Sequence, residues 1–304
     1  MDINEKPKFM PLFGAAIFVL TILALLLIGF PLQMKLGMTG LIITELLLLV
    51  ISALSVIILK LDPKGVFPIK KIRLRPLFAS LFLYISIYPA VLLSGLVITY
   101  FFPQITEIGY AMTQFLHSVP FWATLIISAL MPGICEEALF RGVILSTYKN
   151  NIRRRWLVIL ISAILFGLFH LDPTRFLSTA ILGGVFTYIL LKTDNILLSV
   201  IFHFINNFVS LAAGSALPTD FDATAIYDKP SMLLSIGSFL ILGSIAPVFF
   251  TVALNLFEEK GREIDKAKSL RKWLLSAAVM ALVFILGIVI CVVAINSGAL
   301  DLQQ

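Results

Sequence analysis

Several apolar runs in this chain, such as 10–31 and 39–59, are long enough to cross a lipid bilayer as helices. About 20 apolar residues in a helix span the roughly 30 Å of hydrocarbon in a membrane. A spanning segment must satisfy its backbone polar groups internally, and a helix does so. Composition agrees, because 60% of the 304 residues are apolar and 13% are charged, whereas soluble domains carry about 25% charged residues. The sequence therefore predicts an all-α, polytopic transmembrane helical bundle.

Nine apolar spans can be placed along the chain. They cover 10–31, 39–59, 77–102, 120–147, 156–171, 176–191, 196–214, 231–257 and 273–296. The short pair 156–171 and 176–191 can also form a re-entrant hairpin, so we expect eight to nine helices. We interpret 9–30 as a retained first helix, because its apolar run is too long for a signal peptide. Short connections predict one integral membrane domain, 1–304, with a core region at 120–214.

The net charge of +6 does not indicate nucleic-acid binding. Most of the 23 Lys and Arg residues lie in alternate loops between the apolar spans, as the positive-inside rule predicts for loops that face the cytoplasm. This pattern predicts a cytoplasmic N-terminus. The compact loops favour a prokaryotic cell membrane as the location.

Three charged side chains lie inside the fourth span, in the segment 131–142. Each charge at the bilayer centre costs roughly 2.5–3.5 kcal/mol, so Glu136, Glu137 and Arg141 should face a polar cavity. Glu137 and Arg141 are four residues apart and can pair on one helix face. Glu136 is then the less compensated acid and a candidate general base. Pro132 and Gly133 can loosen the helix one turn earlier. The alternative interpretation is an ion-pair network that only fixes helix packing.

Two further spans each carry a histidine that lies four residues from another notable side chain. At this spacing the two side chains share one face of a helix. Phe166 precedes His170 by one turn, so its ring can wall the imidazole. His203 and Asn207 share a helix face, and both can donate hydrogen bonds to an oxyanion. Each could instead make an ordinary interhelical hydrogen bond. A helix rises by about 1.5 Å per residue. Counted from the proposed cytoplasmic ends of the spans, these groups and the acids therefore lie at similar depths in the membrane.

The remaining reactive side chains are interpreted as structural. Glu45 lies one to two turns from the outer end of its span, near the interface or hydrogen-bonded, and is left out of the site. Cys135 and Cys291 lie in apolar stretches and are expected to be small buried residues without a disulfide. His117 falls in a loop that should face the outside.

The three motifs resemble those of one protease family. Residues 136–141 resemble the E-E-x-x-x-R motif of the CPBP family, the CAAX protease and bacteriocin-processing (abortive-infection) membrane endopeptidases. Residues 166–170 are similar to its F-x-x-x-H motif and residues 203–207 to its H-x-x-x-N motif. The motifs occur in the family's order and lie within about a quarter of the chain.

The resemblance implies a metal-independent intramembrane endopeptidase similar to the type II CAAX prenyl endopeptidase, with no cofactor. It implies that Glu136 activates a water that His170 positions, and that a peptide or protein, lipidated or membrane-anchored, is the substrate in the bilayer. The implied catalytic set is Glu136, Glu137, Arg141, His170, His203 and Asn207, in which Glu137 and Arg141 support the site and His203 and Asn207 form the oxyanion hole.

Two other classes of function stay open on the residues alone. A metal-dependent hydrolase would use glutamate and histidine ligands, although the chain has no H-E-x-x-H helix. A membrane scaffold, immunity factor or transporter would use the polar layer for structure or ion passage. No repeated half, which is common in transporters, is present. The sequence specifies neither the cleavage site nor the oligomeric state.

Overall fold

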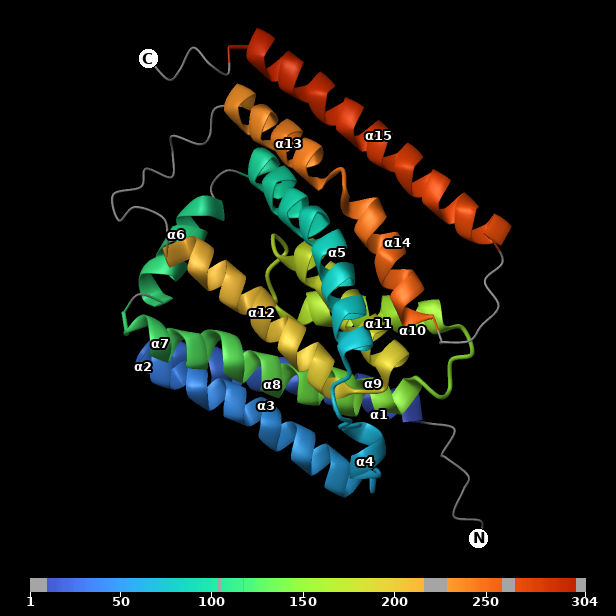
Figure 1. The fold of residues 1–304 in the computed structure, drawn as a ribbon. Coiled ribbons are helices and arrows are strands. Elements are labelled where there is room, and N and C mark those ends of the chain that lie inside the picture. Colours follow the sequence, from blue (N-terminus) through green and yellow to red (C-terminus); the bar gives the residue numbers. More distant parts are fainter. Residues whose placement is uncertain (1–9, 103–104, 117, 216–228, 259–265, 299–304) are drawn as a thin grey trace. The chain divides into compact units, whose positions relative to one another are not determined.

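The computed structural model describes residues 10–102, 105–116, 118–215, 229–258 and 266–298. Every element of regular secondary structure in these ranges is helical (Figure 1). The chain divides into two compact units: unit one is 1–72, 113–171 and 182–217, and unit two is 73–112, 172–181 and 218–304. The single domain and its core region stay predictions. His117 and the loop charges in 1–9, 216–228 and 259–265 lie outside the described residues.

Eight helices in the described part of the chain are long and apolar enough to span a membrane. They are Met10–Leu36, Met38–Ile58, Leu74–Phe101, Phe121–Tyr148, Phe176–Thr193, Ile196–Gly214, Pro230–Phe257 and Ser269–Asn296. The fifth predicted span, 156–171, corresponds to Arg155–Phe169, whose 15 residues reach only about 22 Å as a helix. The predicted multi-pass helical bundle of eight to nine helices is therefore confirmed, and the protein is an integral membrane protein.

Unit one holds most of the helices, and it contains every candidate site residue. The second half of α11, from Leu182 onwards, belongs to it. Its elements are α1 (Met10–Ala24), η1 (Leu25–Gly29), α2 (Phe30–Leu36), α3 (Met38–Ile58), α4 (Pro63–Val66), α7 (Phe121–Leu125), η2 (Ile126–Leu130), α8 (Met131–Glu137), η3 (Ala138–Ile144), α9 (Leu145–Tyr148), α10 (Arg155–Phe169), α11 (Phe176–Thr193) and α12 (Ile196–Ser215), where η denotes a π-helical stretch.

The segment from α7 to α9 is one continuous helix that contains two π-helical stretches. Pro132 lies in the first turn of α8, directly after η2. A proline has no N–H to donate and crowds the carbonyl one turn before it, so the regular hydrogen-bond pattern is interrupted there. The second stretch, η3, contains Arg141. The loosening expected around Pro132 is present, and π-helical turns are frequent at functional sites.

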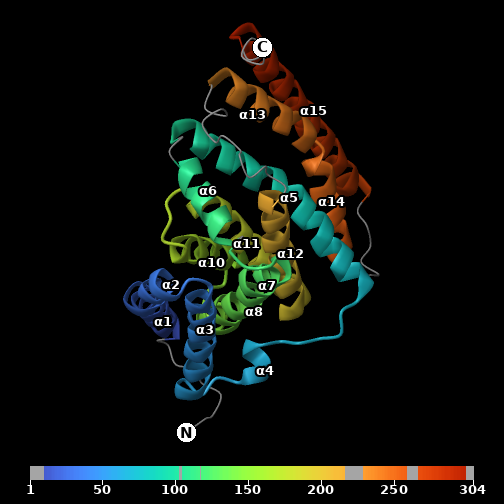
Figure 2. The same cartoon turned by 90° about the vertical axis from the view of Figure 1, so that its left-hand side faces the viewer.

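Helix α8 packs against α3 on one side and α12 on another (Figures 1 and 2). Gly133 permits the contact with α12, because a Cβ at this position would lie 3.3 Å from the backbone nitrogen of Phe204. The backbone of α12 therefore approaches α8 closely. This contact places His203 beside the acids at the end of α8.

Unit two consists of long apolar helices that pack on one another. Arg75, in the first turn of α5, donates to the backbone oxygens of Asn255 and Glu258 at the end of α14. These carbonyls lack partners within their own helix, so the contact satisfies them. The elements of this unit are α5 (Leu74–Phe101), most of α6 (Ile105–Leu116), α13 (Lys229–Gly243), α14 (Ala246–Phe257) and α15 (Lys266–Asn296).

Candidate active site

Glu137 and Arg141 form a completely buried ion pair. Glu137 Oε1 lies 2.9 Å from Arg141 Nη1, and both side chains are 0% exposed. Arg141 Nη2 also donates to the backbone oxygen of Gly183 at 3.0 Å, and the guanidinium lies over the Phe166 ring at 4.3 Å. The pair expected from the four-residue spacing is therefore present. Its link to α11 through Gly183 could not be read from the sequence.

His203 joins the two glutamates. Its Nδ1 lies 2.9 Å from Glu137 Oε1, and its Nε2 lies 3.9 Å from Glu136 Oε2. The ring stacks on Phe186 with centroids 5.2 Å apart. Because Glu137 is paired with Arg141, its carboxylate accepts from His203 Nδ1–H, which fixes one proton of the imidazole. The second nitrogen, Nε2, is thereby directed toward Glu136.

Phe166 separates the two histidines and contacts both. Its ring centroid lies 5.0 Å from that of His170 and 5.7 Å from that of His203, with both pairs edge-to-face. The backbone oxygen of Phe166 lies 2.8 Å from His170 Nδ1. A carbonyl only accepts, so Nδ1 donates, and Nε2 carries the lone pair when the ring is neutral. The expectation that the Phe166 ring covers one side of the His170 imidazole is confirmed.

The structure thus brings four of the six candidate residues into direct contact or near contact: Glu136, Glu137, Arg141 and His203. His170 joins this cluster through Phe166. Asn207 lies one turn after His203 on α12, is half-buried, and its Oδ1 accepts from Asn206 Nδ2 at 3.3 Å. The catalytic roles of all six stay predictions.

Polar atoms in the cluster retain hydrogen-bonding capacity. Within the residues that the structure describes, Glu136 Oε2, Glu137 Oε2 and Arg141 Nε are buried and make no hydrogen bond. Buried polar groups in proteins nearly always have partners, so these atoms mark a place where water or a polar group of a ligand can bind.

The acids and the imidazole of the cluster are engaged with Arg141 and with each other. In the described ranges, no three His, Cys, Asp or Glu side chains are grouped so that they could hold a metal ion. Glu137 Oε1 is shared between Arg141 and His203. The metal-independent reaction itself stays a prediction.

Glu45 is the residue of this region that the sequence interpretation left out. It lies on α3 and is 5% exposed, and α3 packs against α8, which carries Cys135 and Glu136. The signal was present in the sequence, since an acid within an apolar span marks a functional site by default. Cys135 is buried as expected, whereas Cys291 is only half-buried, and both cysteines are free.

Gly183 provides a test of the packing around Phe166. A Cβ at Gly183 would lie 2.7 Å from Phe166 Cβ, whereas one at Gly184 would lie 3.5 Å from Ala163 Cβ, an ordinary contact. We expect Gly183→Ala to shift Phe166, to destabilise the protein by about 1–3 kcal/mol and to reduce its activity. Thermal unfolding in detergent and an activity assay measure both effects. Gly184→Ala is the control, and equal behaviour of the two variants would contradict the prediction.

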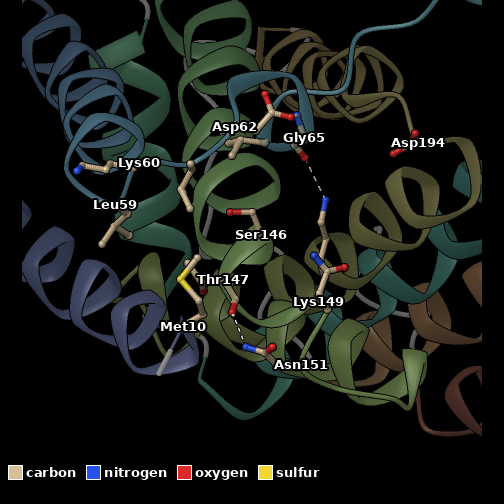
Figure 3. A pocket seen from close by; sticks show the side chains of 13 residues that line it. Met10, Leu59, Lys60, Asp62, Gly65, Ser146, Thr147, Lys149, Asn151 and Asp194 are labelled. Atoms are coloured by element: carbon tan, nitrogen blue, oxygen red, sulfur yellow. Dashed lines mark hydrogen bonds between the residues drawn. The ribbon is translucent and has the colours of Figure 1, made fainter. Parts of the chain in front are cut away.

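A separate cavity of about 590 Å³ lies in unit one where α3, α4 and α9 end (Figure 3). Its polar side chains pair with neighbouring groups: Lys149 Nζ donates to the Gly65 backbone oxygen at 3.3 Å, and Asn151 Nδ2 donates to the Thr147 backbone oxygen at 3.3 Å. None of the candidate catalytic residues lines this cavity. We assign no ligand to it.

Comparison with known protein families gives a match that covers the segment holding the candidate site. Residues 118–209 match the model of the family described as Type II CAAX prenyl endopeptidase Rce1-like. No curated protein and no solved structure matches the chain. The matched segment contains all six predicted site residues and the helices α7 to α12 that carry them. Residues 118–209 are therefore similar to the Rce1-like family of membrane endopeptidases.

Proposed function

We propose that the protein is an intramembrane endopeptidase that hydrolyses a peptide bond with a water activated by Glu136, without a metal ion. The observation that carries this proposal is the buried cluster of Glu136, Glu137, Arg141 and His203 in the segment that matches the endopeptidase family. The match to a family of membrane proteases supports peptide hydrolysis as the reaction class. The arrangement of the side chains supports the catalytic roles described below.

Water attack is assigned to Glu136 and His170. Glu136 accepts one proton of the water while the water oxygen adds to the peptide carbonyl carbon. His170 Nε2 accepts a hydrogen bond from the other water hydrogen, because Nδ1 is committed to the backbone oxygen of Phe166. The water is thus held between a base and an acceptor before it reacts.

His203 and Asn207 are the residues to which we assign stabilisation of the oxyanion in the tetrahedral intermediate. His203 Nδ1 donates to Glu137, so Nε2 can donate to the oxyanion only when the ring carries both protons. Glu137 and Glu136 on either side stabilise that cationic ring, while Arg141 holds Glu137 in place. Asn207 supplies an amide donor from the next turn of α12. When the C–N bond breaks, Glu136 returns its proton to the leaving amine.

The burial of the cluster favours a substrate that reaches it from the membrane. Glu136 and His203 are both buried within candidate spanning helices. A peptide or protein that is lipidated or membrane-anchored is held at the bilayer and presents its scissile segment nearby. We also propose a cytoplasmic N-terminus, on the distribution of the basic loops, and a prokaryotic cell membrane, on the compactness of the loops.

The test is cleavage by the purified protein in liposomes. Prenylated, membrane-anchored and soluble peptides are supplied as a library, and the products are identified by mass spectrometry with and without a chelator. We expect a defined cleavage of anchored peptides that the chelator does not reduce. Cleavage that is lost with chelator and restored by zinc would indicate a metal-dependent hydrolase. No cleavage of any peptide, together with full biological function of Glu136→Gln, would indicate a non-enzymatic membrane protein.

A further inference from the structure

One residue outside the three motifs contacts two of the proposed site residues. Phe186 lies on α11, and its side chain is 0% exposed. Its ring stacks on the His203 imidazole, with the centroids 5.2 Å apart and the planes 21° apart. The guanidinium carbon of Arg141 lies 5.4 Å from the centroid of the same ring. Both distances are those of aromatic stacking and cation–π contacts, so Phe186 forms part of the wall around the cluster.

Hydrogen bonds to the backbone of α11 hold this ring in place. Ser199 is buried on α12, one turn before His203, and its hydroxyl donates to the backbone oxygen of Phe186 at 3.0 Å. Arg141 donates to the backbone oxygen of Gly183, one turn before Phe186. Helix α11 is therefore bonded to both segments whose side chains its phenylalanine contacts. Because these bonds are buried, breaking either one is costly.

The hydrogen bond to Glu137 does not by itself fix the plane of the His203 ring. An imidazole held at Nδ1 can still turn about the line that joins Nδ1 to Glu137 Oε1, 2.9 Å away, because the terminal torsion of histidine is broad. A contact on the face of the ring removes that freedom. Phe186 supplies this contact, and the Phe166 ring lies edge-to-face at 5.7 Å. Together these contacts direct Nε2 toward Glu136 Oε2, 3.9 Å away.

We infer that Phe186 is a positioning residue of the proposed endopeptidase site, because its flat face sets the plane of the His203 imidazole and so the direction of Nε2. This inference rests on the proposed function. Stacking restricts the ring whether it carries one proton or two. A leucine at position 186 would fill much of the space but would present no flat surface, so the imidazole could turn. Misplacement of a catalytic group by about 1 Å can lower a rate by about 100-fold.

Phe186→Leu tests this inference, and Phe202→Leu is the matched control. Phe202 lies on α12 and is 1% exposed, so the same change removes an equally buried ring. We expect Phe186→Leu to lower kcat by about 10–100-fold with little change in KM, because the peptide still binds while the oxyanion donor is misplaced. Phe202→Leu should lower the unfolding temperature but not kcat. Equal losses of kcat in the two folded variants would overturn the inference.

A double-mutant cycle shows whether Phe186 acts through His203. If it does, adding Phe186→Leu to His203→Ala should not lower kcat further, because no imidazole is left to position. Single-turnover kinetics in liposomes measure the residual rates, and thermal unfolding in detergent verifies that each variant is folded. A further loss by the same factor as in the wild-type background would overturn the inference.

Another measurement needs no loss of the ring and no assumption about catalysis. A fluorinated phenylalanine introduced only at position 186 keeps a flat ring of nearly the same size. Its ¹⁹F signal should show an Overhauser contact with histidine ring protons, and this contact should disappear in His203→Gln. Absence of the contact would overturn the inference.

The outcomes for Phe186 and for the proposed function can be told apart. An unchanged kcat in folded Phe186→Leu would overturn the inference and leave the proposed function intact if Glu136→Gln is inactive. Full activity of Glu136→Gln would instead overturn the proposed function.

Discussion

Replacement of Glu136 by Gln is expected to lower kcat/KM for the cleaved peptide by roughly 10²–10⁴-fold, the contribution of a general base. The amide has nearly the same shape, so it should preserve the packing of α8 against α3 and α12. It cannot accept the proton of the attacking water. The loss should therefore fall on kcat, and the peptide should still bind. Steady-state kinetics in liposomes, with thermal unfolding to verify folding, measure the change.

Glu258→Gln is the matched control for this experiment. Glu258 pairs with Lys272 at 2.8 Å in unit two, and both side chains are about 40% exposed. The same chemical change there should leave kcat/KM unaltered. A folded Glu136→Gln protein that cleaves peptide at the wild-type rate would remove Glu136 from the reaction, whatever the control shows.

Replacement of Arg141 by Met is expected to destabilise the protein by about 3–5 kcal/mol, the usual consequence of removing one partner from a buried ion pair. Glu137 is 0% exposed, so water cannot replace the lost cation. The Gly183 backbone oxygen also loses the hydrogen bond from Arg141 and keeps the one from the Thr187 hydroxyl. Methionine keeps much of the side-chain volume and lies against Phe166 without a charge. Thermal or denaturant unfolding in detergent measures the change in stability.

Two further variants separate the charge from the packing in this prediction. Lys70→Met breaks the Lys70–Asp194 pair, whose side chains are 55% and 66% exposed, and it should change stability by about 0–1 kcal/mol. Adding Glu137→Gln to Arg141→Met removes the uncompensated charge and should restore part of the lost stability. An Arg141→Met protein as stable as the wild type would show that Glu137 does not depend on this cation.

The features that the sequence predicted well are those set by local spacing. The span 39–59 corresponds to Met38–Ile58, and 120–147 corresponds to Phe121–Tyr148, because apolar length alone decides membrane crossing. The ion pair between Glu137 and Arg141 follows from helical geometry within one segment. The segment Arg155–Phe169 was the uncertain span, and its 15 residues explain why.

The features that could not be predicted depend on how separate helices pack. The bond from Arg141 to Gly183 joins residues 42 positions apart, and the stacking of His203 on Phe186 needs α11 beside α12. Glu45 was placed near the interface or in a hydrogen bond, and its burial became visible only when α3 was packed against α8. Spacing within one helix contains no information about the partner across the interface.

The π-helical stretch η3 makes this segment sensitive to insertion and deletion. Its hydrogen bonds run from residue i to i+5, so it holds one more residue in the turn than an α-helix does. Deleting one residue between Glu137 and Arg141 would return the turn to α-helical geometry and change the spacing of the two charges from four residues to three. Homologous segments should therefore keep their number of residues here even where the apolar side chains between the two charges are exchanged.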